Sequence, residues 1–290
     1  MRRLLRYLCA AAGVLVLGAA GSVGWLKLHE NELVFAAERS RIHLESNLPA
    51  GAERVSVPEA GSTGLAALIF PAATAGDGGY WVLHLHGNAD SAFSAEQLRH
   101  CQALRAAGFS VMNIDYRGFG KTPGVPSENG LYEDAEAAYQ ALVRRGVPPD
   151  RIILMGHSLG SGPAVWLATR HRAAALVLFG AFTSIPDAAA DRYPLLPVRY
   201  VASLQFDSLV RIRDVHIPVV ITHSRADSLI PYSHALRLYA AANEPKRLLV
   251  FESPREDGFG GHVDALFDNL PSLEGALSGI VAPPLPARSL

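Results

Sequence analysis

The sequence predicts an α/β fold in which a mostly parallel sheet carries helices on both faces. Short apolar runs that stop at glycine alternate with segments of helical spacing along residues 53–270. Alternation of this kind is typical of a parallel sheet whose crossover connections are helices. The chain has 290 residues, of which 49% are hydrophobic, and this is enough apolar material to bury such a sheet on both faces.

Strands are predicted where a short apolar run ends at a turn residue. They fall at 53–70 (two strands joined by a Gly-rich turn), 80–87, 109–120, 151–156, 175–180, 217–223 and 246–252. Because most of these runs lack polar alternation, they are expected to be buried on both faces. Helices are predicted between them, at 94–108, 127–146 and 233–242, with another that follows the strand at 151–156 and ends at Arg172.

One segment interrupts the alternation. Residues 181–216 lie between two predicted strands and have about the length of two short helices with their connections. An insertion at this place is expected to cover the strand ends as a small cap, and it is too short for a second domain. We therefore predict one α/β domain over residues 31–280, followed by a Pro-rich tail at 281–290.

The N-terminus predicts a membrane segment. Arg2, Arg3 and Arg6 precede an uncharged stretch at 7–26, which as a helix would cross the hydrocarbon core of a bilayer, about 30 Å thick. Residues 1–30 are assigned to a membrane anchor or a signal segment, because small residues near the end of the stretch also allow cleavage. The arginines favour a cytoplasmic N-terminus with the following domain outside, in the periplasm or another extracytoplasmic space. The alternative is secretion after cleavage.

Charge and the pattern of cysteine and histidine residues argue against a nucleic-acid-binding protein, a disulfide and a metal site. The chain has 26 Lys and Arg against 27 Asp and Glu, a net charge of −1, so it lacks the basic character of nucleic-acid-binding proteins. Cys9 and Cys101 fall in separate predicted elements and predict no disulfide. His84 and His86 alternate along one predicted strand, but the sequence offers no third ligand beside them. Neither a metal nor a cofactor is predicted.

The run "IILMGHSLGSGPAVWLA" places a serine in a turn of small residues. Gly156 and Gly160 bracket Ser158 in the G-x-S-x-G spacing of a nucleophile elbow, between a predicted strand and a predicted helix. Such a sharp turn needs small neighbours, and it exposes the serine hydroxyl at the carboxyl edge of the sheet. An ordinary Gly-rich turn with a capping serine would show the same residues, so the interpretation depends on partners elsewhere in the chain.

A catalytic serine needs a histidine base and a carboxylate that orients it. Elbow folds supply them in the chain order Ser, Asp or Glu, His, after later strands. Only His234 and His262 follow the predicted strand that ends at His223. His234 falls in a predicted helix, whereas His262 follows the last strand in a loop, and Asp227 lies in the loop after His223. We predict Ser158, Asp227 and His262 as a catalytic triad.

An oxyanion intermediate requires two N–H donors. We predict the backbone N–H of Leu159, directly after the serine, and the backbone N–H of Asn88, in the loop after the strand at 80–87. The Asn88 side chain could equally stabilise its loop, and the sequence leaves both roles open. Asp115 is interpreted as a brace for the neighbouring loop, and Phe119 as a candidate pocket wall.

Together these motifs resemble a known superfamily. The segments "HGNAD", "DYRGFGKTPG", "GHSLGSGP", "PLLPVRYV…FDS" and "GGHVD", in this order and spacing, resemble the α/β-hydrolases. More narrowly they resemble its small-capped, often membrane-anchored serine hydrolases, which include esterases and protein depalmitoylases. The resemblance implies an eight-stranded sheet whose second strand is antiparallel. Ser224 and Val263 replace the usual glycine and asparagine of the family, at positions that affect loop geometry and not the triad.

The expected activity is that of a serine hydrolase, cleaving carboxylic esters or thioesters through the triad and an acyl-enzyme. The expected partner is a small-molecule or lipid-like acyl ester, with the membrane bound through the N-terminal segment and no nucleic acid. Two alternatives remain: an acyltransferase that uses the same triad, and a non-catalytic binding protein on the same fold. The oligomeric state and the natural substrate are not indicated by the sequence.

Overall fold

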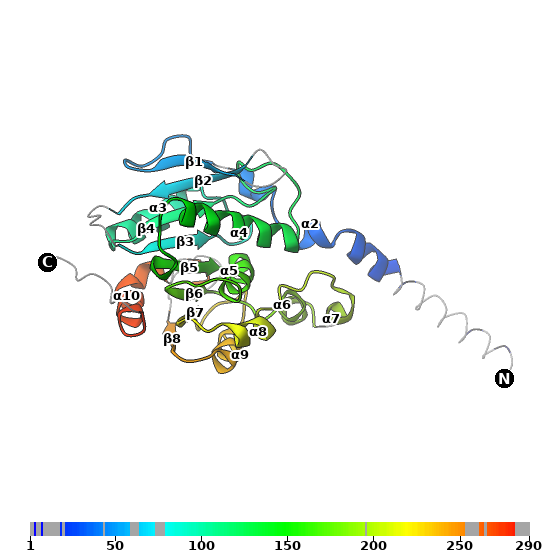
Figure 1. Cartoon of the computed structure of the whole chain (residues 1–290). Coiled ribbons are helices and arrows are strands. Elements are labelled where there is room, and N and C mark those ends of the chain that lie inside the picture. The colour runs from blue at the N-terminus through cyan, green and yellow to red at the C-terminus, as the bar shows by residue number, and fades with distance from the viewer. Residues whose placement is uncertain are drawn as a thin grey trace.

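One twisted sheet forms the centre of the computed structural model (Figure 1). The structure describes residues 3, 7, 18, 21–42, 44–58, 64–72, 79–194, 196–252, 261–263 and 266–281. The strands are β1 (Glu53–Val57), β2 (Leu65–Phe70), β3 (Trp81–Leu85), β4 (Ser110–Ile114), β5 (Ile152–His157), β6 (Ala175–Phe179), β7 (Val219–Ser224) and β8 (Lys246–Phe251). Their order in the sheet is β1-β2-β4-β3-β5-β6-β7-β8.

Strand direction confirms the predicted fold class. β2 is antiparallel to both of its neighbours, β1 and β4, and the other pairs are parallel. In the middle of the sheet Leu83 of β3 is in register with Met112 of β4 and Leu154 of β5. The result is a mostly parallel eight-stranded sheet with an antiparallel second strand, the arrangement expected of an α/β-hydrolase fold.

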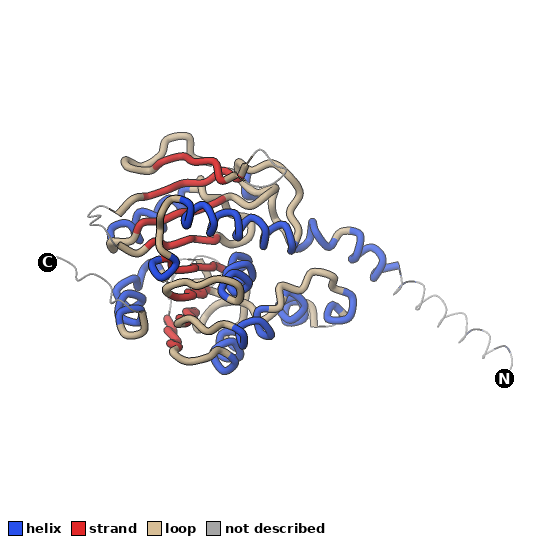
Figure 2. Tube along the Cα trace, in the orientation of Figure 1, coloured by secondary structure: helices blue, strands red, loops and turns tan. Residues whose placement is uncertain are grey.

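Helices cover both faces of this sheet (Figure 2). The helices among the described residues include α2 (Glu30–Val34), α3 (Ala95–Ala106), α4 (Glu128–Arg144), α5 (Ser161–Ala168), α6 (Ile185–Arg192), α7 (Val198–Val201), α8 (Ser208–Arg211), α9 (Ser233–Ala241) and α10 (Leu270–Ser278), and α3, α4, α5, α9 and α10 are among those in contact with strands. Side chains of α4, α5 and α9 pack in one apolar cluster, and those of α3 and α10 pack in another. The sheet separates the two clusters.

β5 shows why the strands are apolar at nearly every position. Ile152 and Leu154 belong to the cluster with α4 and α5, whereas Ile153 and Met155 belong to the cluster with α3 and α10. Successive side chains of a strand point to opposite faces, so a strand between two helix layers must be apolar on both. Each such side chain contributes about 1.5–3 kcal/mol on full burial, which holds the strand that leads into the predicted elbow.

α5 is shorter than predicted. It ends at Ala168 rather than at Arg172, because the N–H groups of Arg170 and His171 both donate to the carbonyl of Leu167. Two donors on one carbonyl close the helix and start a turn, a feature that helical spacing alone does not indicate.

The inserted segment at 181–216 holds α6, α7 and α8, one short helix more than predicted. The side chain of Ser184 caps α6 by accepting a hydrogen bond from the N–H of Asp187, at 3.1 Å. His234 of α9 bonds Asp191 of α6 at 2.8 Å and Thr183 at 2.8 Å. The segment is therefore attached to the domain by buried polar contacts. The predicted domain limits themselves remain a prediction.

The prediction of a single membrane span, with the domain outside the cytoplasm, is wrong. Within the described ranges, no helix combines the length and the apolar character that a bilayer span requires. Residues 21–28 are helical and continue, after a turn at His29, into α2. This helical stretch carries Lys27, Glu30 and Glu32, and charged side chains are costly in a bilayer core. Most of the stretch at 7–26, and the predicted tail after Val281, lie outside the described residues.

Candidate active site

Ser158 lies at a strained turn between β5 and α5. β5 runs directly into a short 3-10 helix, Ser158–Gly160, and α5 follows. Ser158 has a φ of 48°, which side chains with a β-carbon rarely adopt. A β-carbon at Gly160 would collide with the carbonyl oxygen of Leu85 in β3, and one at Gly156 would stand 2.5 Å from the carbonyl oxygen of Gly160. The backbone itself therefore fills the space around the serine, which explains the glycines of the motif.

Asp227 and His262 are in direct contact. His262 Nδ1 lies 2.6 Å from Asp227 Oδ2, and both residues are buried. The second carboxylate oxygen, Oδ1, accepts hydrogen bonds from the N–H groups of Leu229 and Ile230, each at 2.9 Å. The loop after β7 thus fixes the carboxylate, and the carboxylate fixes the imidazole through Nδ1. His262 Nε2 is buried and has no hydrogen-bond partner among the described residues.

A second histidine also contacts this carboxylate. His223, at the end of β7, has Nε2 3.2 Å from Asp227 Oδ2 and 2.8 Å from the carbonyl oxygen of Ile230. Burial alone would raise the pKa of Asp227, but the hydrogen bonds from His223 and His262 hold that pKa well below its usual value. Asp227 is therefore a carboxylate over the ordinary pH range. Sequence reasoning did not find the His223 contact, since only the four-residue spacing hinted at it.

His157 joins the serine turn to the loop that carries His262. Its Nε2 donates to the backbone carbonyl of His262 at 3.0 Å, and its ring stacks on Phe179 with centroids 4.8 Å apart. Burial holds the pKa of His157 well below its usual value, so the ring is neutral. Because His157 precedes Ser158 directly, this bond brings the serine and His262 to one edge of the sheet.

The loop after β3 passes against the same turn. A β-carbon at Gly87 would stand 3.0 Å from His157 Nδ1 and 3.4 Å from the β-carbon of Ser158. The side chain of Asn88 holds the chain at 34–36: Nδ2 donates to the carbonyl of Val34 at 2.6 Å, and Oδ1 accepts from the N–H of Ala36 at 2.9 Å. The amide side chain is therefore a loop brace. The oxyanion roles of the Asn88 and Leu159 N–H groups remain predictions.

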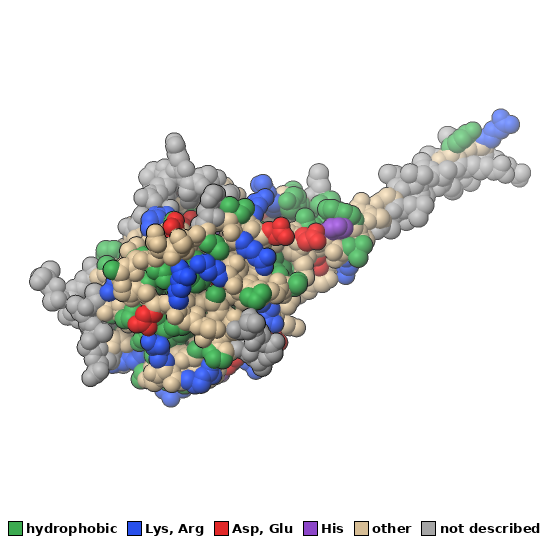
Figure 3. Space-filling view, turned by 90° about the horizontal axis from the view of Figure 1, so that it is seen from above, with side chains coloured by type: hydrophobic (Ala, Val, Ile, Leu, Met, Phe, Trp, Pro, Cys, Tyr) green, Lys and Arg blue, Asp and Glu red, His purple; other side chains and the backbone are tan. Residues whose placement is uncertain are grey.

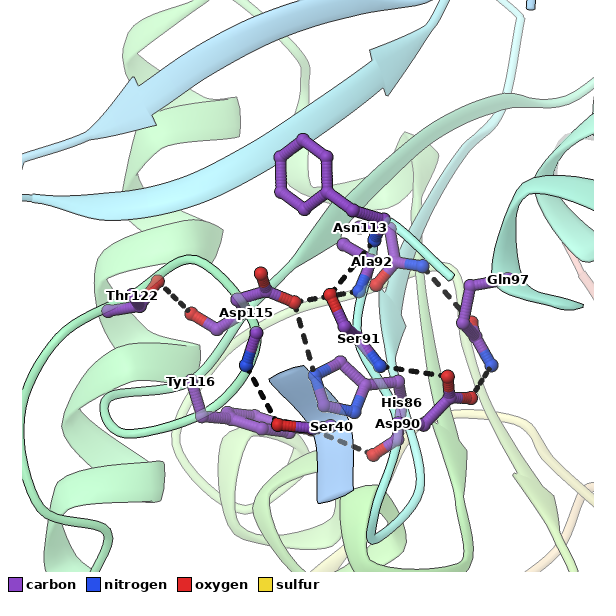
Figure 4. A network of polar contacts seen from close by, with 12 residues as sticks. Ser40, His86, Asp90, Ser91, Ala92, Gln97, Asn113, Asp115, Tyr116 and Thr122 are labelled. Atoms are coloured by element: carbon purple, nitrogen blue, oxygen red, sulfur yellow. Dashed lines mark hydrogen bonds and ion pairs between the residues drawn. The ribbon is translucent and has the colours of Figure 1, made fainter. Parts of the chain in front are cut away.

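Asp115 braces this loop from one side (Figure 4). Its Oδ1 accepts from the N–H of Ala92 and its Oδ2 from the N–H of Lys121, both at 2.7 Å, and His86 Nε2 lies 3.8 Å from Oδ1. Burial raises the pKa of Asp115, and His86 and the N–H donors oppose that rise. One buried carboxyl group thus ties the loop after β3 to the loop after β4.

Two other candidate residues of the sequence analysis, His234 and Phe119, have different surroundings. His234, the competing histidine, bonds Asp191 and Thr183 and does not contact Asp227. Phe119 is fully buried and packs edge-on against Phe35, with ring centroids 6.4 Å apart. Its position as a pocket wall remains a prediction.

His84 occupies the core beneath the site. It is fully buried in β3, and neither ring nitrogen has a hydrogen-bond partner in the part of the chain that the structure describes. Burial, reinforced by the nearby His100, holds its pKa well below the usual value. The described ranges also contain no group of three His, Cys, Asp or Glu residues arranged to hold a metal ion.

Comparisons with known proteins point to one family. A family model described as "Serine aminopeptidase, S33" matches residues 80–211. The chain is 38% identical over 239 residues to the uncharacterized protein Rv2307c of Mycobacterium tuberculosis. The matched region covers 82% of this chain and 84% of that protein. The chain is also 31% identical over 185 residues to the lysophosphatidylserine lipase ABHD12 of Danio rerio, covering 58% and 48% of the two chains. An alpha-beta hydrolase structure from Vibrio vulnificus has a TM-score of 0.69 at 18% identity, over 86% of this chain and 92% of that one.

Proposed function

The chain belongs to the α/β-hydrolase superfamily, and from this premise we propose that it is a serine hydrolase of carboxylic esters or thioesters. Ser158 is the nucleophile, His262 the general base and Asp227 the carboxylate that orients it. The observation that carries the proposal is the 2.6 Å contact between His262 Nδ1 and Asp227 Oδ2. That contact occurs beside a strained turn with Ser158 at its tip, in the chain order that elbow enzymes use.

The proposed reaction has two halves. Ser158 Oγ bonds to the acyl carbon while His262 Nε2 takes the hydroxyl proton, and the carbonyl electron pair moves to oxygen, where the N–H groups of Leu159 and Asn88 stabilise it. Collapse breaks the bond to the alcohol or thiol, which leaves with the proton from His262. Water then attacks the acyl-enzyme by the same path, so the carboxylic acid is released and Ser158 regains its proton. Asp227 stabilises the imidazolium formed in each half.

Ester rather than amide cleavage is proposed for two reasons. The relative from Danio rerio is named as a lipase, and lipases cleave esters. Ester and thioester leaving groups also need less help to depart than an amine, so the triad is sufficient without further recognition of a peptide. The family model named for an aminopeptidase makes an amino-acid amide the comparison substrate for the test.

The test measures hydrolysis of 4-nitrophenyl butyrate and of an amino-acid 4-nitroanilide by the full chain. We expect turnover of the ester, a loss of at least about 10³-fold in kcat for Ser158→Ala and His262→Ala, and a loss of about 10⁴-fold for Asp227→Asn. His216→Ala is the matched control, because His216 is exposed, and it should keep wild-type activity. Ester turnover that survives Ser158→Ala unchanged would overturn the proposal.

A further inference from the structure

An apolar groove runs between the N-terminal helical residues and the inserted segment. Its volume is about 340 Å³. Trp25, Leu33 and Val34 line one wall, and Ile185, Ala189 and Val198 are among those that line the other. In a view from above, the described N-terminal residues leave one end of the body, and apolar side chains lie there beside acidic and histidine side chains (Figure 3). We call this feature the cap groove.

Both walls of the cap groove are linked, by a hydrogen bond or a short stretch of chain, to the candidate active site. Val34 is held by Asn88, in the loop that passes against Ser158, through the 2.6 Å bond between Asn88 Nδ2 and the Val34 carbonyl. On the other wall, Ile185 lies five residues after Gly180, where a β-carbon would stand 2.9 Å from Cε1 of His262. Val34 and Ile185 also pack against the apolar cluster to which Leu159 belongs. Each wall of the cap groove is thus connected, by that hydrogen bond or along the chain, to a segment that contacts the Ser158 turn or the His262 ring.

The lining of the cap groove suits an apolar occupant. Eleven of its thirteen lining residues are apolar, and the exceptions are Lys27 and Glu30. The Glu30 carboxylate is already engaged, because Oε1 accepts hydrogen bonds from the N–H groups of Ser203 and Leu204, at 2.6 and 2.9 Å. A polar headgroup placed here would lose most of its hydrogen bonds to water and find Lys27 as the one free charged partner in the described lining, which is unfavourable for a headgroup with several polar atoms. A hydrocarbon chain has no such requirement.

We propose that the cap groove binds the acyl chain of the substrate, so that the N-terminal helix forms half of the acyl site. The inference rests on the proposed function for the identity of the reacting group, and it adds the substrate class: esters or thioesters of medium to long unbranched acyl chains. At about 30 Å³ for a group the size of water, a volume of 340 Å³ holds on the order of ten methylene groups.

A chain-length series tests this in the full-length protein. For 4-nitrophenyl esters from acetate to hexadecanoate, kcat/KM should rise by up to about fourfold per methylene and level off near ten to twelve carbons. Ala189→Phe, which fills the cap groove from α6, should lower kcat/KM for the dodecanoate ester by at least tenfold and leave the acetate ester within twofold. Ala190→Phe is the matched control on the same helix, since Ala190 does not line the groove, and it should preserve the whole profile.

Binding of dodecanoate, measured by calorimetry on Ser158→Ala, separates this inference from the proposed function because it needs no turnover. Dodecanoate should bind Ser158→Ala and should bind at least tenfold more weakly when Ala189→Phe is added, but not when Ala190→Phe is added. If no ester is hydrolysed and dodecanoate still binds in this pattern, the proposed chemistry fails and the acyl site stands. If esters are hydrolysed but neither the length profile nor dodecanoate binding responds to Ala189→Phe, the acyl site is wrong and the chemistry stands.

Discussion

Gly180, at the end of β6, lies directly against the imidazole of His262. A β-carbon at position 180 would stand 2.9 Å from His262 Cε1 and 3.0 Å from Nδ1, and the φ of Gly180 is 56°. Only glycine satisfies both the backbone angle and the close approach. The lack of a side chain at Gly180 thus leaves the space that the His262 ring needs in order to contact Asp227.

Gly180→Ala is therefore expected to displace His262 and lower kcat by at least about 100-fold, because small errors in the placement of a catalytic group have large effects on rate. Gly275→Ala is the control, since a β-carbon at Gly275 in α10 meets nothing within 4 Å. That variant should keep full activity and gain about 1 kcal/mol in free energy of unfolding. Ester hydrolysis assays and denaturant titrations provide the two readouts. Equal activity in both variants would contradict the placement of His262.

His157→Phe tests the bond between His157 Nε2 and the His262 carbonyl. The phenyl ring can keep the stacking on Phe179 but leaves a buried carbonyl without its donor, a cost of about 1–3 kcal/mol. If that cost falls on the alignment of His262, kcat should drop about tenfold or more while KM changes by less than threefold. The exposed His216→Phe should change neither constant. An unchanged kcat for His157→Phe would show that the bond does not position His262.

Asp227→Asn should weaken the decrease in free energy of unfolding at acid pH. The pKa of Asp227 is depressed in the folded protein, so its carboxylate contributes stability that is present above the usual aspartate pKa, about 3.9. That contribution is lost as pH falls below this value, because the unfolded chain takes up a proton that the folded chain resists. Urea titrations at pH 5, 4 and 3.5 should show wild type losing stability faster than the variant. Parallel losses would place the depressed pKa elsewhere.

His84→Leu should change the pH dependence of the free energy of unfolding in a higher pH range than Asp227→Asn does. The pKa of His84 is depressed by burial, so its neutral form is compatible with the fold above the usual histidine pKa, about 6.5, and stability is lost as pH falls below that value. Each such group contributes a slope of up to about 1.4 kcal/mol per pH unit. The advantage of His84→Leu over wild type should grow from pH 7.5 to pH 5.5, whereas exposed His216→Leu should show no such trend. A constant difference would contradict a neutral, buried His84.

The architecture could be predicted because its signals are local. Apolar runs, several of which end at glycine, marked the strands, and the small residues around Ser158 marked the sharp turn that β5 makes. The Asp and His of the candidate triad were selected by chain order and by their positions in loops, and the structure places Asp227 and His262 in contact. Their catalytic roles remain proposals for the experiments above.

Other features depend on contacts between distant segments, which spacing does not show. The bonds of His223 and His157 around the candidate triad arise only when β5, β7 and the His262 loop meet. The limits of α10 were not predicted, although Asp264 was interpreted as a helix start, and the anchor was predicted from the absence of charge at 7–26. Hydropathy of that stretch does not show that the described helical residues continue through Lys27 and Glu30. It also does not show that Glu30 hydrogen-bonds to the inserted segment.

The central claim is that Ser158 is an activated nucleophile, and covalent labelling tests it most directly. The full chain is treated with a fluorophosphonate, and the adduct is located by intact mass and peptide mapping. We expect one label per chain on Ser158, no label on heat-denatured protein and no label on Ser158→Ala. Ser272→Ala, which removes an exposed serine of α10, should label fully. A label that persists in Ser158→Ala, or that maps to another residue of the native protein, would contradict the central claim.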